Sequence, residues 1–97
     1  LELELPEEMS GYEATQYFDI IFQKYGLMKN QDYRLQVLWT NETDVDPICV
    51  IEYRDINNKY KYFIYSQQQG KKYMDADEYL DFCKNLDIIK KWSSDHQ

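Results

Sequence analysis

The sequence predicts a mixed α+β domain in which a helix, three antiparallel strands and a second helix follow one another. Residues 11–25 and 76–92 have the apolar spacing of amphipathic helices. Residues 33–40 and 49–65 are rich in the β-branched and aromatic side chains typical of strands. We expect a meander sheet with both helices packed on one face, which leaves the other face open.

The composition is that of a small, folded and acidic chain. Its 97 residues are 43% hydrophobic and 16% aromatic, enough for one modest core, so we expect a single domain over 1–97 with frayed ends at 1–9 and 93–97. A formal charge of −7 disfavours general binding to phosphate backbones. No apolar run approaches the about 20 residues of a membrane-spanning helix, so we expect a soluble, cytoplasmic protein.

The first helix has a start signal, an apolar stripe and a stop signal. Ser10 and Glu13 have the spacing of a capping box, and Gly26 suits a helix end. The stripe consists of Ala14, Tyr17, Phe18, Ile21, Phe22 and Tyr25. Before this helix, leucine alternates with glutamate up to Pro6, which fits either a short edge strand or a frayed terminus.

A β-hairpin is predicted over residues 49–65, with its turn at 57–58. A two-residue turn would pair Ile51 with Ile64 on the face that the helices cover. It would also set Arg54 opposite Lys61, a pair of like charges. A three-residue loop, which reverses the facing of the second strand, therefore remains open.

The second helix is expected to follow a polar segment, residues 66–72, that ends the hairpin. Asp75 is its predicted N-cap, and Glu78 lies three residues further on, where a capping box needs it. Its buried stripe is predicted to consist of Tyr79, Phe82, Cys83, Leu86, Ile89 and Trp92. A polar tail then ends the sequence.

The residues that usually carry catalysis or bind metals are scarce. His96 is the single histidine and lies in the polar tail, so a histidine-based nucleophile has no support. Cys49 and Cys83 lack metal-ligand spacing, and we expect two reduced thiols, with a disulfide between them as the weaker alternative. Asp44 and Asp46 resemble part of a cation loop without its later glycine and glutamate. We expect no enzyme, metal or cofactor.

Our leading hypothesis is a protein-binding domain that acts as an inhibitor, immunity-type protein or adaptor on a partner with a basic surface. The open sheet face would supply Val50, Phe63 and Tyr65 as apolar anchors. An acidic surface would supply Asp44, Asp46, Asp75, Asp77, Glu78 and Asp81. If the acidic clusters converge, this surface would imitate the phosphates of a nucleic acid.

The alternative hypothesis is single-stranded nucleic-acid binding, because lysines alternate with aromatic side chains along residues 59–65. The residues proposed for it are Lys59, Lys61, Tyr65, Lys71 and Lys72. The net negative charge makes this the weaker of the two hypotheses.

Overall fold

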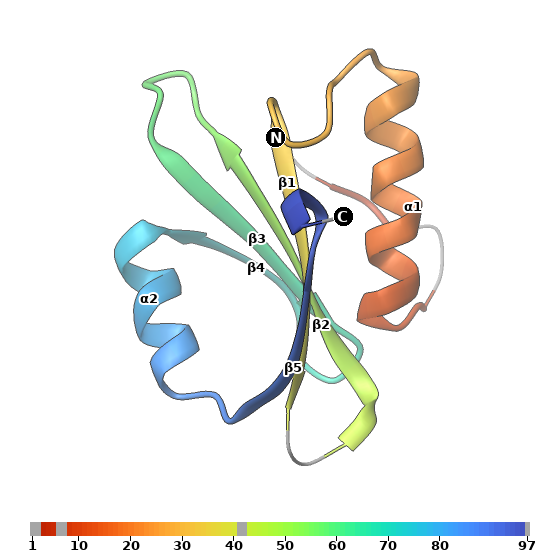
Figure 1. The fold of residues 1–97 in the computed structure, drawn as a ribbon, viewed down its shortest axis with the longest axis vertical. Helices are drawn as coiled ribbons and strands as arrows, with labels where there is room; N and C mark the ends of the chain where they lie inside the picture. Colours follow the sequence, from red (N-terminus) through yellow and green to blue (C-terminus); the bar gives the residue numbers. More distant parts are fainter. Residues whose placement is uncertain (1–2, 6–7, 41–42, 97) are drawn as a thin grey trace.

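A five-stranded antiparallel sheet lies between two helices (Figure 1). The computed structural model describes residues 3–5, 8–40 and 43–96. Over these residues the elements are α1 (Gly11–Lys24), β1 (Tyr33–Thr40), β2 (Thr43–Arg54), β3 (Tyr60–Ser66), β4 (Gly70–Asp75), α2 (Ala76–Lys84), β5 (Ile88–Ser93) and the 3-10 helix η1 (Ser94–His96). The α+β class is confirmed, but the number of strands and the packing of the helices differ from the prediction.

The sheet extends the expected three-strand meander by one strand at each edge. Its order is β4-β3-β2-β1-β5, and β5 reaches the free side of β1 only after the chain has passed through α2. Because residues 66–72 are polar, the prediction takes all of them as a segment that ends the hairpin and misses β4. In the structure only 67–69 form the turn. Gly70 begins the strand in the left-handed region, at φ 72°.

The expectation that both helices pack on one face is wrong. Phe18 of α1 lies edge-on to Phe63 of β3, with ring centroids 5.5 Å apart, on one face of the sheet. On the other face, Val50 of β2 belongs to a buried cluster against which Tyr79 and Phe82 of α2 pack. Successive strand residues point to opposite faces, so a sheet covered on both sides has two apolar layers.

The hairpin of β2 and β3 adopts the three-residue alternative, and the two-residue register is wrong. Ile51 pairs with Phe63 rather than with Ile64. Arg54 pairs with Tyr60, which removes the like-charge pair that the two-residue turn would create. Phe63 therefore faces α1 and Ile64 faces α2.

The ends of α1 are as predicted. Ser10 accepts a hydrogen bond from the Glu13 N–H, and Glu13 accepts one from the Ser10 N–H, which makes the capping box complete. At the other end Gly26 has φ 83° and donates to Gln23 O, while Leu27 donates to Phe22 O. These two bonds form a Schellman motif, which satisfies carbonyls that the helix leaves free.

The second helix starts as predicted but ends earlier. Asp75 and Glu78 form the expected capping box. The helix stops at Lys84, and β5 pairs along β1 with Trp92 opposite Val37. Apolar residues spaced along 86–92 fit a helix as well as a strand, and it is pairing with a strand far away in sequence that decides between them.

The N-terminal residues that the structure describes form no strand. Leu3 is buried; its N–H donates to the hydroxyl of Tyr73, and its carbonyl accepts from Nζ of Lys71. The remaining part of the possible edge strand, residues 1–2 and 6, lies outside the described residues. In the described part of the chain, no helix is long and apolar enough to cross a membrane.

Candidate protein-binding site

The turn between β2 and β3 is built around the side chain of Asp55. Its Oδ1 accepts hydrogen bonds from the backbone N–H groups of Asn57 (2.9 Å) and Lys59 (3.0 Å). The main chain closes the same loop, because Asn58 N donates to Asp55 O and Asp55 N donates to Lys59 O, each at 2.9 Å. The bond from Lys59 is the main reason why the pKa of the Asp55 carboxyl lies below its usual range.

Asn58 completes this turn in the left-handed region, with φ 62°. Asparagine tolerates that conformation better than most residues. A three-residue hairpin loop commonly combines a type I turn with one such left-handed residue. The tip of the hairpin is therefore held in one shape by its side chains as well as its backbone.

Ile56 lies at the apex of this turn and is 99% exposed. Single exposed apolar residues are ordinary on protein surfaces, but turns favour polar residues or proline near their start. The β-branched side chain has few rotamers, and the loop that carries it is already ordered. Little conformational freedom would be lost if Ile56 entered an apolar pocket on another protein.

A groove of about 400 Å³ lies between the hairpin and the start of α2. Lys59 and Lys61 line it from the hairpin, and Asp75 and Asp77 line it from the end of β4 and the first turn of α2. Tyr60, 43% exposed, lies between the lysines. Lys61 and Asp75 are direct register partners of β3 and β4, so the opposed charges of the groove are fixed by the sheet.

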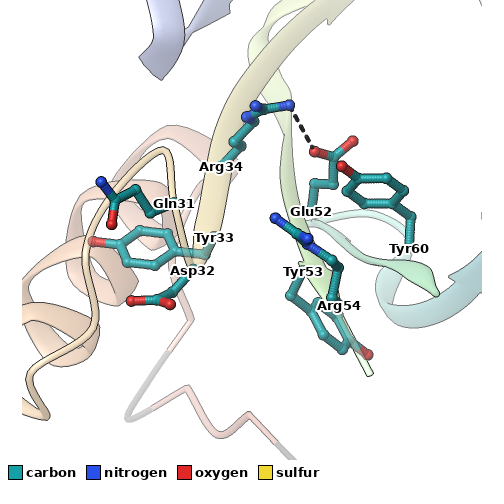
Figure 2. Close-up of a pocket in the computed structure, with 8 residues that line it drawn as sticks. All are labelled: Gln31, Asp32, Tyr33, Arg34, Glu52, Tyr53, Arg54 and Tyr60. Carbon is teal, nitrogen blue, oxygen red and sulfur yellow. Dashed lines mark hydrogen bonds and ion pairs between the residues drawn. The ribbon is translucent and has the colours of Figure 1, made fainter. Parts of the chain in front are cut away.

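Tyr60 also borders a second, much smaller hollow on the α2 side of the sheet (Figure 2). Arg34 pairs with Glu52 at 3.5 Å, and the Arg54 guanidinium lies over the Tyr60 ring, 5.5 Å from its centroid. The hollow has a volume of about 10 Å³, which is room for about one water molecule. It therefore shapes the surface next to Tyr60 and offers no site for a ligand of its own.

Two stacked tyrosines join α2 to the sheet behind this surface. The rings of Tyr62 and Tyr79 lie parallel with centroids 4.1 Å apart. Tyr62 OH donates to Glu52 Oε2 at 2.8 Å, and Tyr79 OH donates to Gln36 Oε1 at 2.9 Å. Burial is the main cause that raises the pKa of both phenols, so both stay neutral donors well above neutral pH.

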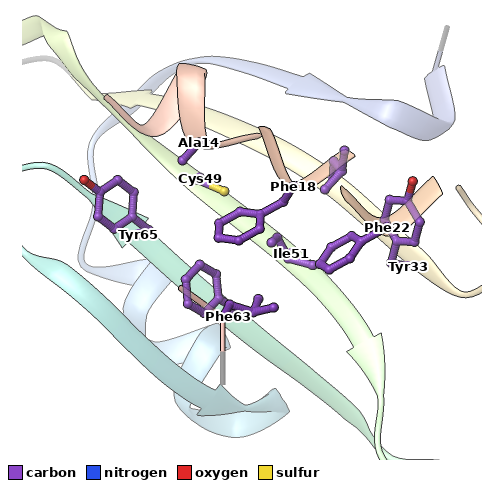
Figure 3. Packing of buried hydrophobic residues seen from close by; sticks show 10 residues of the cluster. Ala14, Phe18, Phe22, Tyr33, Cys49, Ile51, Phe63 and Tyr65 are labelled. Carbon is purple, nitrogen blue, oxygen red and sulfur yellow. The ribbon is translucent and has the colours of Figure 1, made fainter. Parts of the chain in front are cut away.

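The apolar anchors expected on an open face are buried, and that expectation of exposure is wrong. Val50 and Phe63 are 0% exposed and Tyr65 is 6% exposed. Figure 3 shows Phe63 and Tyr65 directed toward Phe18 and Ala14 of α1. Tyr65 OH donates to Met9 O at 2.6 Å, so even its polar end is occupied. Val50 is buried because α2 covers its face of the sheet, whereas Phe63 and Tyr65 are buried because the three-residue loop turns them toward α1.

The acidic residues proposed for binding have different environments. Asp46 accepts hydrogen bonds from the backbone of Gln67 and Gln68 and so holds the β3–β4 turn. Asp75 and Glu78 cap α2. Asp77, Glu78 and Asp81 are exposed on α2, whereas the side chain of Asp44 lies outside the described residues.

The acidic clusters on the two helices do not meet on one face. Glu13 is exposed on α1, and Asp77 and Asp81 are exposed on α2. The sheet lies between these helices (Figure 1). Of the acidic residues proposed for binding, Asp75 and Asp77 are those that line the groove, where they face the lysines of the hairpin.

The residues proposed for nucleic-acid binding are divided between the two faces. Lys71 pairs with the buried Tyr65, and its ammonium group donates to Leu3 O at 3.1 Å. Lys72 pairs with Ile64 and so points to the α2 side. Lys59 and Lys61 lie together at the groove, without a stacking contribution from Tyr65.

Among the described residues, no group of three or more metal-ligating side chains comes together. Cys49 and Cys83 are free, and they belong to opposite sides of the sheet. Burial raises the pKa of the Cys49 thiol to about 12, which keeps it protonated and unreactive. The side chain of His96 lies outside the described residues.

The apex residue Ile56 and its neighbour Arg54 are absent from the set of binding residues that the sequence suggests. The available signal was an isoleucine between Asp55 and Asn57, in a loop that otherwise consists of polar residues. An isoleucine in this position can be identified as exposed only once the length of the hairpin loop is known. Comparisons with protein-family models, curated proteins and solved structures found nothing that matches this chain.

Proposed function

We propose that this chain is a non-catalytic protein-binding domain that holds its partner with the tip of the β2–β3 hairpin and the adjoining groove. The observation that carries the proposal is the 99% exposure of Ile56 on a turn that four hydrogen bonds fix in place. Interfaces depend on a few preorganised anchors that enter pockets on the partner. An inhibitor, immunity-type protein or adaptor would act by occupying such a pocket.

The charges around Ile56 define the complementary surface of the partner. Arg54, Lys59 and Lys61 flank the tip, so the partner pocket would be bordered by carboxylates. Asp77 and Asp81 on α2 would meet basic side chains on the far side of the groove. The overall charge of −7 would steer a partner with a basic surface toward the chain over a longer distance.

A reducing compartment such as the cytoplasm suits this proposal. Cys49 and Cys83 are both free thiols, and the buried Cys49 takes part in the packing of the core. Disulfides form and persist mainly in oxidising compartments. We therefore place the proposed interaction inside the cell.

The proposal is tested by capturing partners from the native host with the intact chain and with Ile56→Ser, followed by titration of the purified partner. Loss of an apolar anchor costs about 2 kcal/mol or more, so we expect the Kd to rise at least about thirtyfold. Thermal unfolding should be unchanged, because Ile56 contacts solvent rather than the core.

Ile89→Ser is the matched control, because Ile89 is 54% exposed on β5, away from the hairpin. This variant should bind the partner as the unchanged chain does. Equal binding by the Ile56→Ser chain, or equal loss in both variants, would remove the hairpin tip as the binding site.

A further inference from the structure

The face of α1 that points away from the sheet carries exposed apolar side chains. Ile20 is 63% exposed, and Leu27, in the turn after the helix, is 41% exposed. The opposite face of the helix, with Ala14 and Phe18, is buried against the sheet. In the described part of the chain, no other element covers the outer face of α1 (Figure 1).

The outer residues of α1 follow the spacing of a helix-pairing seam. We use "α1 seam" for Glu13, Gln16, Ile20 and Gln23, which are exposed and separated alternately by three and four residues; the exposed Leu27 follows in the turn after the helix. Alternation of three and four keeps a stripe facing a second helix over several turns. The stripe is narrow and partly polar, so it suits a weak contact with a helix of the same kind.

We propose that the α1 seam pairs with the α1 seam of a second copy of this chain, in antiparallel orientation about a two-fold axis. Two-fold contacts use the same patch on both copies, so the patch must complement itself. Glu13 lies in the first turn of α1 and Lys24 in the last. In the antiparallel arrangement, Glu13 of each copy faces Lys24 of the other.

Charge selects this face for self-association. Two chains of formal charge −7 repel, so a stable contact needs a surface that is locally balanced. The seam region provides one acid and one base at opposite ends, and the neighbouring Asp19 and Lys29 already pair with each other at 3.4 Å. The outer face of α2 carries three exposed acids, Asp77, Glu78 and Asp81, against one exposed base, Lys84, so two such faces would repel each other.

The test is sedimentation of the intact chain from low micromolar to millimolar concentration. We expect the mass to rise from 11.9 kDa toward twice that value. Ile20→Ser should raise the dimer Kd at least about tenfold, since each dimer loses two buried isoleucine side chains. Ile89→Ser, the exposed isoleucine on β5, is the matched control and should dimerise normally.

A second pair of variants tests the charge arrangement. Lys24→Glu places a carboxylate opposite Glu13 and should weaken the dimer, whereas Lys24→Arg should preserve it. Circular dichroism confirms that each variant remains folded. A chain that stays at one copy throughout, or a dimer that Ile20→Ser leaves unchanged, overturns the proposal; in both cases the proposed hairpin site is unaffected.

Discussion

Gly11 shows how a single residue sets the distance between α1 and the sheet. A Cβ atom at this position would lie 2.0 Å from Pro47 O and 2.9 Å from Cys49 N, both of them backbone atoms of β2. Such contacts are far inside van der Waals distance, and backbone cannot move aside as a flexible side chain can. Glycine at the start of α1 therefore allows the helix to touch β2 directly.

Gly11→Ala should lower the free energy of unfolding by about 3 kcal/mol, because the helix must move away from β2. Gly26→Ala is the control: its φ of 83° is unfavourable for alanine, but nothing lies within 4 Å of the added Cβ, and we expect a loss of about 1 kcal/mol. Urea unfolding of both variants measures the difference. Equal losses would show that close packing at Gly11 is unimportant.

Ile56 is the residue of the candidate site that the sequence alone does not define. Its exposure depends on whether the hairpin has a two- or a three-residue loop, and Asn57 and Asn58 permit both. The choice is made by Asp55, whose carboxylate binds the backbone of Asn57 and Lys59. Side-chain bonds of this kind are visible only in three dimensions, so Ile56 could not be predicted, whereas Lys59, Lys61, Asp75 and Asp77 of the groove were among the residues that the sequence suggested.

Among the elements, those whose signals are local could be predicted and those that depend on distant pairing could not. The capping box at Ser10 and the turn at Gly26 determine α1 within the segment itself. The strand β5 depends on β1, which lies far away in sequence. Local propensity leaves such a segment ambiguous, because both a helix and a strand suit its apolar residues.

One signal for the second helix layer was present in the sequence of the hairpin. Residues 48–51 and 63–65 are uninterrupted apolar runs, and all of them are buried. Strands covered on both faces show such runs, whereas a strand with one wet face alternates. The runs exclude an open face over the middle of the hairpin, and so they argue against Val50, Phe63 and Tyr65 as exposed anchors.

Ser94, which is 2% exposed, holds the end of β5 against β1. Its Oγ accepts from Leu35 N at 3.0 Å and donates to Asn30 Oδ1 at 2.5 Å. Asn30 in turn donates to Ser94 O at 2.9 Å, although the two residues are 64 positions apart in sequence. This part of the expected frayed tail is therefore bound to the sheet.

Ser94→Ala should lower the free energy of unfolding by about 2 kcal/mol, because the buried N–H of Leu35 loses its acceptor. Amide hydrogen exchange should become faster in β5 than in the central strands. Ser93→Ala is the control, since the Ser93 hydroxyl bonds only to exposed Asp95 among the described contacts. If Ser93→Ala costs as much, the buried bond is not what holds β5.

At the scale of the whole molecule, both layers contain phenols with a raised pKa. Tyr33 lies on the α1 side, where its hydroxyl donates to Asp19 at 2.6 Å, and Tyr62 and Tyr79 lie on the α2 side. Burial is the main cause that raises the pKa of Tyr33, and the Asp19 carboxylate adds to it. Ionisation of any of them disturbs the packing between a helix and the sheet.

The chain should therefore lose stability in alkaline solution. A phenol whose pKa is higher in the folded than in the unfolded state stabilises the fold fully below about pH 10, the unfolded value. Above that pH, the unfolding free energy should fall by about 1.4 kcal/mol per pH unit for each such tyrosine. Chemical unfolding measured at a series of pH values from about 8 upward gives this slope.

Tyr33→Phe should reduce the alkaline slope by the contribution of one phenol. The same change at Tyr25, which is 80% exposed, is the control. A flat dependence on pH in the unchanged chain would show that these phenols ionise in the folded state without consequence. If Tyr33→Phe leaves the slope unchanged, the loss of stability at high pH comes from the phenols on the α2 side of the sheet.

The sheet order also determines when β1 obtains its second neighbour during synthesis. A ribosome makes β1 to β4 before β5, so the growing chain can form the meander while the outer edge of β1 is still unpaired. An unpaired strand edge readily adds a strand from another chain. Until residues 88–93 leave the ribosome, β1 is thus a further edge, besides β4, that nascent chains expose to one another and to chaperones.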